Sequence, residues 1–122
     1  MNVIFLNGYG MDLNQISAEI YANNNQTVLK VFPVIGLSKT HAVKSLVTDS
    51  AASVTTMACE EKTFNGEIGI NSRNQKLESV LEICQENRYN TGLIAKSTII
   101  HATPASFYAN VGSQKNKKLP FN

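Results

Sequence analysis

Three short polar clusters carry the side chains that could do chemistry, and each follows an apolar run. The cluster "NGYGMD" comes after "NVIFL", "TDSAAS" comes after "SLV", and "HATPAS" comes after "GLIAKSTII". Ligands of open α/β sheets bind outside the carboxyl ends of the strands, so this placement predicts one shared site. The chemistry on offer there is nucleophilic attack by a serine and ligation of a cation by oxygen or nitrogen.

Ser50 is the candidate nucleophile. It follows Asp49 and precedes Ala51 and Ala52. If a helix begins at or just after Ser50, the amides of Ala51 and Ala52 and the positive end of the helix converge on its hydroxyl and favour an anion. The small side chains would then leave room for a tetrahedral group. Serine and aspartate are also the favoured helix caps, so a purely capping role for Ser50 is the ordinary alternative.

His101 and Thr103 are the candidate cation ligands, one residue apart after an apolar run. Such a pair could bind a cation directly or through water. Local rules offer a plainer alternative, in which Thr103 caps a helix opened by Pro104 and His101 is a polar loop residue. Both alternatives stay open on the residues alone.

Strands and helices are expected to alternate along the chain. Strands are expected at residues 2–7, 45–47 and 92–100, with a further β-rich run at 27–32. Helices are expected at 12–23 with Asp12 as N-cap, at 51–61, at 77–84 and after Thr103–Pro104, and a turn at Asn65–Gly66. This alternation predicts an α/β fold with a mostly parallel sheet.

Length and composition indicate a single domain over residues 1–122, with a frayed polar tail at 113–122. The net charge of +2 argues for neither nucleic acid nor an anionic membrane surface, and no apolar run is long enough to span a membrane. The sequence after Met1 does not resemble a signal peptide, so a cytoplasmic location is expected as written. Cys59 and Cys84 have no CxxC spacing and are expected to be buried free thiols, although a disulfide would be possible after export.

The motifs "LVTDSAAS", "KTFNGEIGIN" and "HATPASFYANV" resemble those of the alkaline phosphatase family in residue identity, order and spacing. The resemblance covers most of the chain. It implies part of a three-layer sandwich around a mostly parallel sheet, and hydrolysis of phosphate monoesters assisted by zinc and magnesium. In that family the serine matched by Ser50 becomes phosphorylated and also contacts the metal site. The resemblance further implies that Asp49 orients a phosphate-binding arginine, that Thr103 binds magnesium directly, and that His101 lies in or near the magnesium shell.

The sequence departs from the family pattern at two site positions. Tyr9 stands where the family has an aspartate that bridges magnesium and zinc, and a neutral phenol cannot offset the charge of two dications. Asp12 could replace that carboxylate only if the turn were rebuilt. Gln114 stands where an arginine clamps phosphate, and its amide cannot supply a charged, bidentate fork.

Family members are several times longer, and the remaining zinc ligands and the magnesium glutamate of the family fall beyond Asn122. We therefore expect this truncated chain to be a weak or inactive phosphatase. Its ligands would be phosphate monoesters or inorganic phosphate, and another chain could complete its sheet. The alternatives are a non-catalytic remnant that binds an anion or a partner, and the product of a decayed gene. Family members are commonly periplasmic or extracellular, which contrasts with the cytoplasmic expectation.

Overall fold

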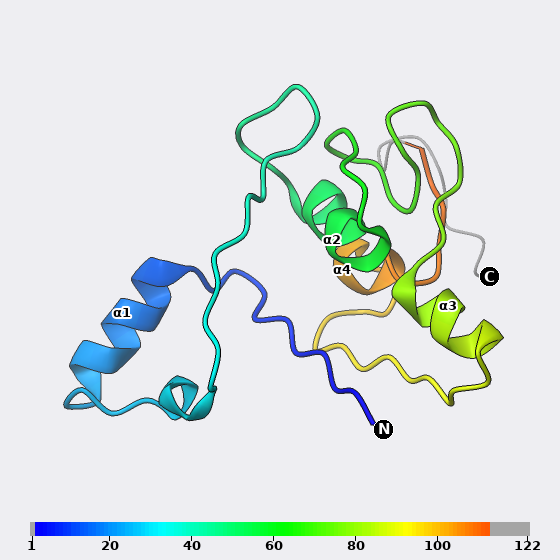
Figure 1. Cartoon of the computed structure of the whole chain (residues 1–122). Helices are drawn as coiled ribbons and strands as arrows, with labels where there is room; N and C mark the ends of the chain where they lie inside the picture. Colours follow the sequence, from blue (N-terminus) through cyan, green and yellow to red (C-terminus); the bar gives the residue numbers. More distant parts are fainter. Residues whose placement is uncertain (1, 113–122) are drawn as a thin grey trace. The chain divides into compact units, whose positions relative to one another are not determined.

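The computed structural model describes residues 2–112, which belong to two compact units of the chain, 1–37 and 38–122 (Figure 1). The predicted tail at 113–122, with Gln114, lies outside the described residues. The prediction that residues 1–122 form one domain stays a prediction.

The first unit contains the helix α1, Leu13–Ala22, and the short 3-10 helix η1, Val28–Val31. Asp12 is the N-cap of α1, as predicted: its carboxylate accepts hydrogen bonds from Asn14 N at 2.7 Å and Gln15 N at 3.4 Å. The Gln15 side chain accepts from Asp12 N in return, which completes a capping box. The Asp12 carboxylate is thus occupied by the start of its own helix.

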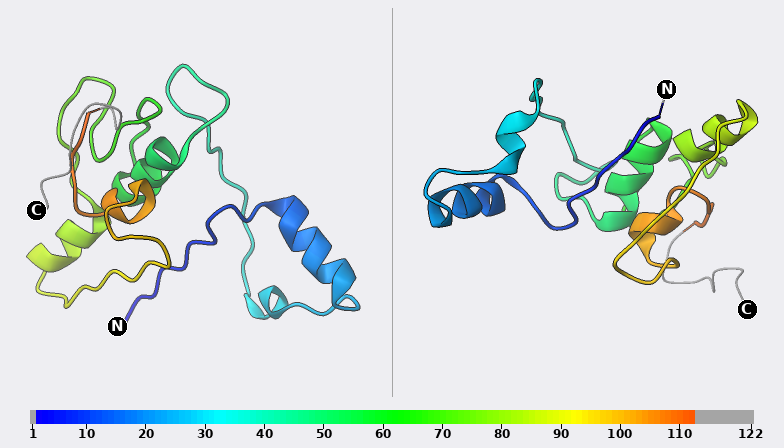
Figure 2. Two further views of the ribbon diagram at one scale, coloured as in Figure 1. Left: turned by 180° about the vertical axis from the view of Figure 1, so that it is seen from behind. Right: turned by 90° about the horizontal axis from the view of Figure 1, so that it is seen from below.

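The second unit is built around α2, Ser50–Cys59, which packs against both α3, Val80–Glu86, and α4, Ala102–Ala105. The three views show α2 and α4 side by side (Figures 1 and 2). Small residues allow this close approach, because Ala51, Ala102 and Ala105 are at most 2% exposed and lie in one buried cluster with Ile68 and Val111. Ala51 therefore packs two helices together, rather than leaving room for a ligand as the sequence suggested.

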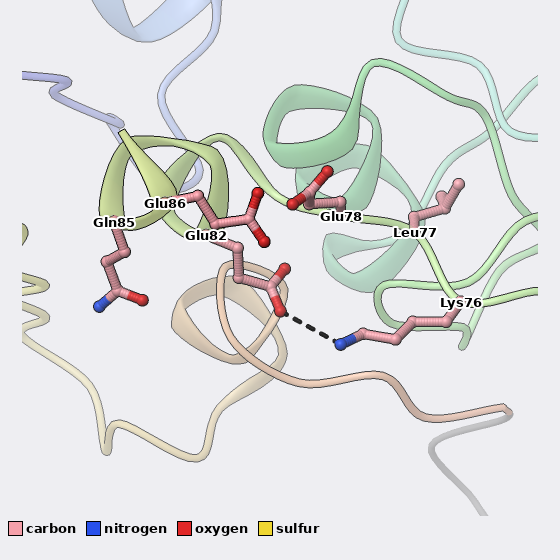
Figure 3. A pocket seen from close by; sticks show the side chains of 6 residues that line it. All are labelled: Lys76, Leu77, Glu78, Glu82, Gln85 and Glu86. Atoms are coloured by element: carbon pink, nitrogen blue, oxygen red, sulfur yellow. Dashed lines mark hydrogen bonds and ion pairs between the residues drawn. The ribbon is translucent and has the colours of Figure 1, made fainter. Parts of the chain in front are cut away.

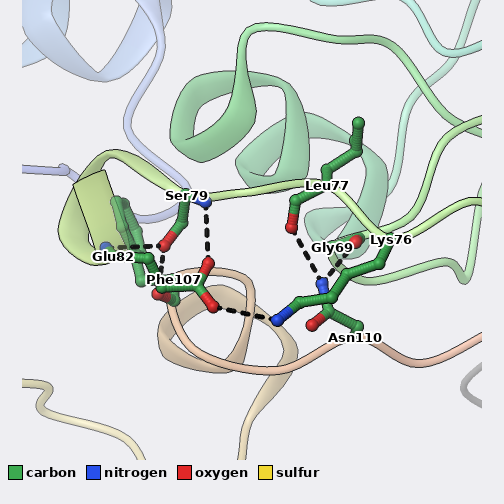
Figure 4. A network of polar contacts seen from close by, with 7 residues as sticks. All are labelled: Gly69, Lys76, Leu77, Ser79, Glu82, Phe107 and Asn110. Atoms are coloured by element: carbon green, nitrogen blue, oxygen red, sulfur yellow. Dashed lines mark hydrogen bonds and ion pairs between the residues drawn. The ribbon is translucent and has the colours of Figure 1, made fainter. Parts of the chain in front are cut away.

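A second buried cluster joins α2 to α3. Val54, Ala58 and Phe107 form its centre, with Leu81 of α3 packed against it. Ser79 caps α3 and is 1% exposed: its hydroxyl accepts from Glu82 N at 3.2 Å and donates to Phe107 O at 2.7 Å (Figure 4). One serine thus closes the N-terminus of α3 and ties it to the segment that follows α4.

The segments predicted as strands do not form strands within residues 2–112. Residues 2–7, 45–47 and 92–100 lie outside helices without a strand ladder, and 27–32 contains η1 instead. Pairing is limited there to isolated bridges, Ala42 with Ser45, Ile68 with Val111, and Ile70 with Lys76. A strand exists only through hydrogen bonds to a neighbour, so an apolar run without a neighbour remains a single extended segment. The described residues therefore do not supply the predicted parallel sheet.

Apolar side chains of these segments are accordingly exposed. The exposed fraction is 83% for Ile4, 92% for Leu46 and 99% for Ile94. The predicted run at 27–32 turns into a 3-10 helix because the Thr27 hydroxyl accepts from Leu29 N at 3.3 Å, a local bond that competes with extended pairing. The helix and turn predictions are confirmed more closely, since a turn does contain Asn65 and Gly66.

Candidate active site

Asp49, rather than Ser50, is the cap of α2. The Asp49 carboxylate accepts from Ala52 N at 2.9 Å, while Ser50 is the first residue of the helix and is half-buried. The alternative in which Ser50 serves only as the cap is therefore wrong. The predicted convergence of two amides on Ser50 also needs correction, because the Ala52 amide is already bonded to Asp49.

His101 occupies the N-cap position of α4, but its side chain makes no capping hydrogen bond. Thr103 lies within the helix, which begins at Ala102, so the predictions that Thr103 is the cap and Pro104 the first helical residue are each wrong by two positions. The Oγ1 atom of Thr103 is buried and finds no hydrogen-bond partner among the described residues. A buried hydroxyl oxygen without a partner is uncommon in a folded protein and calls for an explanation.

The structure brings the Ser50 motif and the Thr103 motif together. Ala51 follows Ser50 directly, Ala102 precedes Thr103 directly, and these two alanines lie in the same buried cluster. The starts of α2 and α4 are thereby held near each other, as the sequence predicted for the "TDSAAS" and "HATPAS" clusters. Tyr9 belongs to the first unit, where it lies in a turn and is 63% exposed.

Thr55 fixes α2 relative to α4, and sequence reasoning missed it. Its side chain is fully buried, and its Oγ1 accepts from Gly69 N at 3.1 Å and lies 3.4 Å from Ser106 Oγ. Ser106 Oγ donates to Ala102 O within α4 at 2.9 Å. The sequence offers only two hydroxyl residues as a signal, Thr55 just after "TDSAAS" and Ser106 at the end of "HATPAS", and only the fold shows that they meet.

Asn110 also bonds to the backbone of Gly69 (Figure 4). Its amide donates to Gly69 O at 2.5 Å and to Leu77 O at 3.1 Å. Gly69 has a φ of +60°, and a Cβ atom there would collide with Ala109 O. The position thus requires glycine, because the backbone after α4 approaches it closely.

The second unit has a cavity of about 370 Å³, and Figure 3 shows its lining. It is lined by Lys76, Leu77, Glu78, Glu82, Gln85 and Glu86. Lys76 and Glu82 form an ion pair at 3.3 Å, and the charge of Glu86 together with some burial raises the pKa of Glu78 above its usual value. Three carboxylates facing one lysine repel a phosphate anion, so this cavity does not suit a phosphate monoester.

Cys59 and Cys84 are both free thiols, as expected, but each is partly exposed and not fully buried. No helix within residues 2–112 is long and apolar enough to cross a membrane. Nor do those residues contain a group of three or more His, Cys, Asp or Glu side chains that could hold a metal ion. The donor set that zinc prefers is thus not present in the described part of the chain.

The family model for alkaline phosphatase matches residues 1–119. Alkaline phosphatase 3 of Bacillus subtilis (strain 168) is 38% identical over 123 aligned residues, which cover 94% of this chain and 27% of that protein. The repressible alkaline phosphatase of Saccharomyces cerevisiae is 38% identical over 117 residues, covering 90% of this chain and 21% of that protein.

Solved structures of alkaline phosphatases are also similar to this chain. The alkaline phosphatase from the Antarctic bacterium TAB5 superposes with a TM-score of 0.81 at 40% identity, covering 87% of this chain and 31% of that one. A mutant of the same enzyme with Mg bound in the M3 site gives a TM-score of 0.82 at 38% identity. The fold is therefore that of part of an alkaline phosphatase. The chain belongs to the alkaline phosphatase family, and it spans less than a third of the length of these relatives.

Proposed function

We propose that this chain carries the nucleophile portion of a phosphate monoester hydrolase, with Ser50 as the nucleophile. The Ser50 oxygen attacks phosphorus, the alcohol leaves, and water later removes the phosphoryl group from the serine. The proposal is supported by membership of the family and by the position of Ser50 at the start of a helix capped by its neighbour Asp49. In that role Asp49 fixes the backbone at Ser50 through its bond to Ala52 N.

Thr103 is the observation that carries the metal part of the proposal. Its buried Oγ1 has no partner in the described residues, and a hard oxygen of this kind suits magnesium. Thr103 would bind the ion, with His101 beside it in the outer shell or as a ligand. A bound magnesium ion would neutralise charge that develops on the phosphoryl oxygens. The described residues do not fit zinc, because they bring no three His, Cys, Asp or Glu side chains together.

Activity of this chain alone is expected to be low. Tyr9 offers no carboxylate and Gln114 offers no guanidinium, and each lost source of charge stabilisation costs several kcal/mol of barrier. Exposed Leu46 and Ile94, at 92% and 99%, support the further expectation that other chain segments cover these runs and complete a sheet. A non-catalytic role in binding an anion or a partner is the second candidate, favoured by the changes at Tyr9 and Gln114.

The test is to incubate the full chain with an aryl phosphate, magnesium and zinc, and to measure the intact mass and the released alcohol. We expect slow transfer of one phosphoryl group to the wild-type chain and none to Ser50→Ala. We also expect weaker magnesium binding by Thr103→Val in titration calorimetry. Saturable heat with inorganic phosphate but no phosphorylated serine would favour the binding remnant. Neither phosphorylation nor saturable heat would overturn both candidates and leave the decayed gene product.

A further inference from the structure

Asn65 bonds to the backbone on both sides of the residue before Asp49. Its Oδ1 accepts from Asp49 N at 3.1 Å, and its Nδ2 donates to Val47 O at 3.0 Å. The two bonds enclose Thr48 and hold the main chain at the point where it enters α2. An amide is the side chain that can donate and accept at once in this way, because a carboxylate has no proton to give to a carbonyl.

The turn that carries Asn65 is itself firmly held. Thr63 is 0% exposed, its O accepts from Val43 N at 2.9 Å, and its hydroxyl donates to Glu67 Oε2. The same Glu67 oxygen accepts from Phe64 N at 3.3 Å, and Glu67 N donates back to Phe64 O at 3.2 Å. Asn65 therefore extends from a rigid support, as a positioning residue needs to.

Apart from Asn65, the Ser45 hydroxyl also bonds to this segment, donating to Val47 O at 2.7 Å. Leu46 and Val47 are 92% and 78% exposed, and no strand ladder within residues 2–112 includes them. At the N-terminus of α2, Asp49 O accepts from Ser53 N and the Asp49 carboxylate accepts from Ala52 N. Asp49 thus has its carbonyl and side chain fixed by α2 and its amide fixed by Asn65, and Ser50 is the next residue.

We propose that Asn65 is a positioning residue for Ser50: it fixes the backbone from Val47 to Asp49 and so sets the direction of the Ser50 hydroxyl. This inference rests on the proposed nucleophilic role of Ser50. Asn65 does not touch the reacting atoms. It is an exposed residue, so its loss lowers the reactivity of Ser50 more than the stability of the fold. Small displacements of a nucleophile lower rates steeply, because reaction needs a near-attack geometry.

The experiment compares Asn65→Ala and Asn65→Asp with the wild-type chain. Asn71→Ala is the control, because Asn71 is also a turn asparagine, with Oδ1 accepting from Arg73 N and Gln75 N, both at 3.0 Å. Amide hydrogen exchange at Asp49 and Ser50 is measured by NMR, and the rate of Ser50 phosphorylation by an aryl phosphate is measured by mass spectrometry over a range of substrate concentrations. Circular dichroism checks that each variant is folded.

In Asn65→Ala we expect amide exchange at Asp49 and Ser50 to rise about tenfold. We expect the maximal phosphorylation rate to fall about tenfold or more, with the half-saturating concentration changed by less than about twofold. Asn65→Asp keeps an acceptor for Asp49 N but loses the bond to Val47 O. Its exchange and phosphorylation rates should therefore lie between those of the wild type and Asn65→Ala. Asn71→Ala should leave both readouts unchanged, even if it unfolds more easily.

The outcomes separate this inference from the proposed function. Unchanged exchange at Asp49 and Ser50 in folded Asn65→Ala overturns the positioning role, whether or not Ser50 reacts. An equal fall in phosphorylation rate in Asn71→Ala overturns it as well, because the effect is then one of general stability. If the wild-type serine is never phosphorylated while its amide responds to Asn65→Ala, the nucleophilic function fails and the backbone clamp stands.

Discussion

Replacing Thr55 by valine tests the link between the two site helices most directly. Valine keeps the shape of the side chain and removes its hydroxyl. That hydroxyl is fully buried, accepts from Gly69 N at 3.1 Å, and lies 3.3 Å from Glu67 O and 3.4 Å from Ser106 Oγ. A hydroxyl carries a single proton, so Thr55 donates to one of these acceptors at a time.

The magnitude follows from what Thr55→Val leaves behind. The buried N–H of Gly69 loses its acceptor, which costs about 1–3 kcal/mol, and the donated bond is worth about 1 kcal/mol more. We therefore expect the free energy of unfolding to fall by about 3 kcal/mol. The added methyl group of valine recovers little, because the site is already filled.

The assay is urea unfolding followed by circular dichroism, with two comparison variants. Thr56→Val is the matched control, because in the contacts described the Thr56 hydroxyl bonds only to Ala52 O of its own helix, at 2.9 Å. This substitution should change the free energy of unfolding by less than about 0.5 kcal/mol. Thr55→Ser keeps the hydroxyl and loses one methyl group, at a cost of about 1 kcal/mol. A Thr55→Val chain as stable as Thr56→Val would refute the reasoning.

Two further predictions concern titratable groups near α3. Burial opposes the charge of Glu82, but hydrogen bonds from Ser79 and Lys76 prevail and hold its pKa below the usual 4.5. The contribution of Glu82 to the free energy of unfolding is therefore complete above pH 4.5 and is lost as the pH falls through the lower pKa of the folded state. In urea unfolding at a series of acidic pH values, Glu82→Gln should lose less stability than wild type, whereas the exposed control Glu61→Gln should follow wild type; an unchanged acid profile in Glu82→Gln contradicts the assignment. Burial, with the charge of Glu82, raises the pKa of Cys59 to about 11 from 9.0, so at pH 8 its thiolate should be about a hundredfold scarcer than usual. Iodoacetamide should alkylate Cys59 far more slowly in the folded Cys84→Ser chain than in urea, and equal rates would contradict this.

Local signals in the sequence predicted the helices well. Asp12 caps α1 as expected, and Val80, Leu81 and Cys84 of the predicted stripe lie in α3, although that helix begins at Val80 and leaves Leu77 outside it. These features depend on a few neighbouring residues, such as a capping side chain and a helical repeat, so they can be read without knowing the fold. The family was likewise predictable, because three motifs in fixed order are specific, and the match over residues 1–119 confirms it.

The contacts that join the motifs could not be predicted in the same way. Thr55 and Ser106 are 51 positions apart in sequence, and nothing in either motif indicates that their hydroxyls meet. The sequence identifies Asn65 only as a turn residue, because Asn-Gly is a turn signal wherever it occurs. Its bonds to Val47 and Asp49 follow from the path of the chain 16 to 18 positions away. Long-range polar contacts of this kind leave no periodic pattern in the sequence.

The error over strands and the role proposed for Asn65 have one physical origin. The sequence of residues 45–47 favours an extended segment, but an extended segment becomes a strand only when a neighbour forms hydrogen bonds with its N–H and C=O groups. In the described residues no strand does so; the Asn65 amide bonds to Val47 O and Asp49 N instead, and the Ser45 hydroxyl shares Val47 O. A side chain thus does locally what a sheet neighbour does along a whole strand, at the position that directs Ser50. This is why we expect the loss of one exposed amide to be felt at Ser50 before it is felt in the stability of the fold.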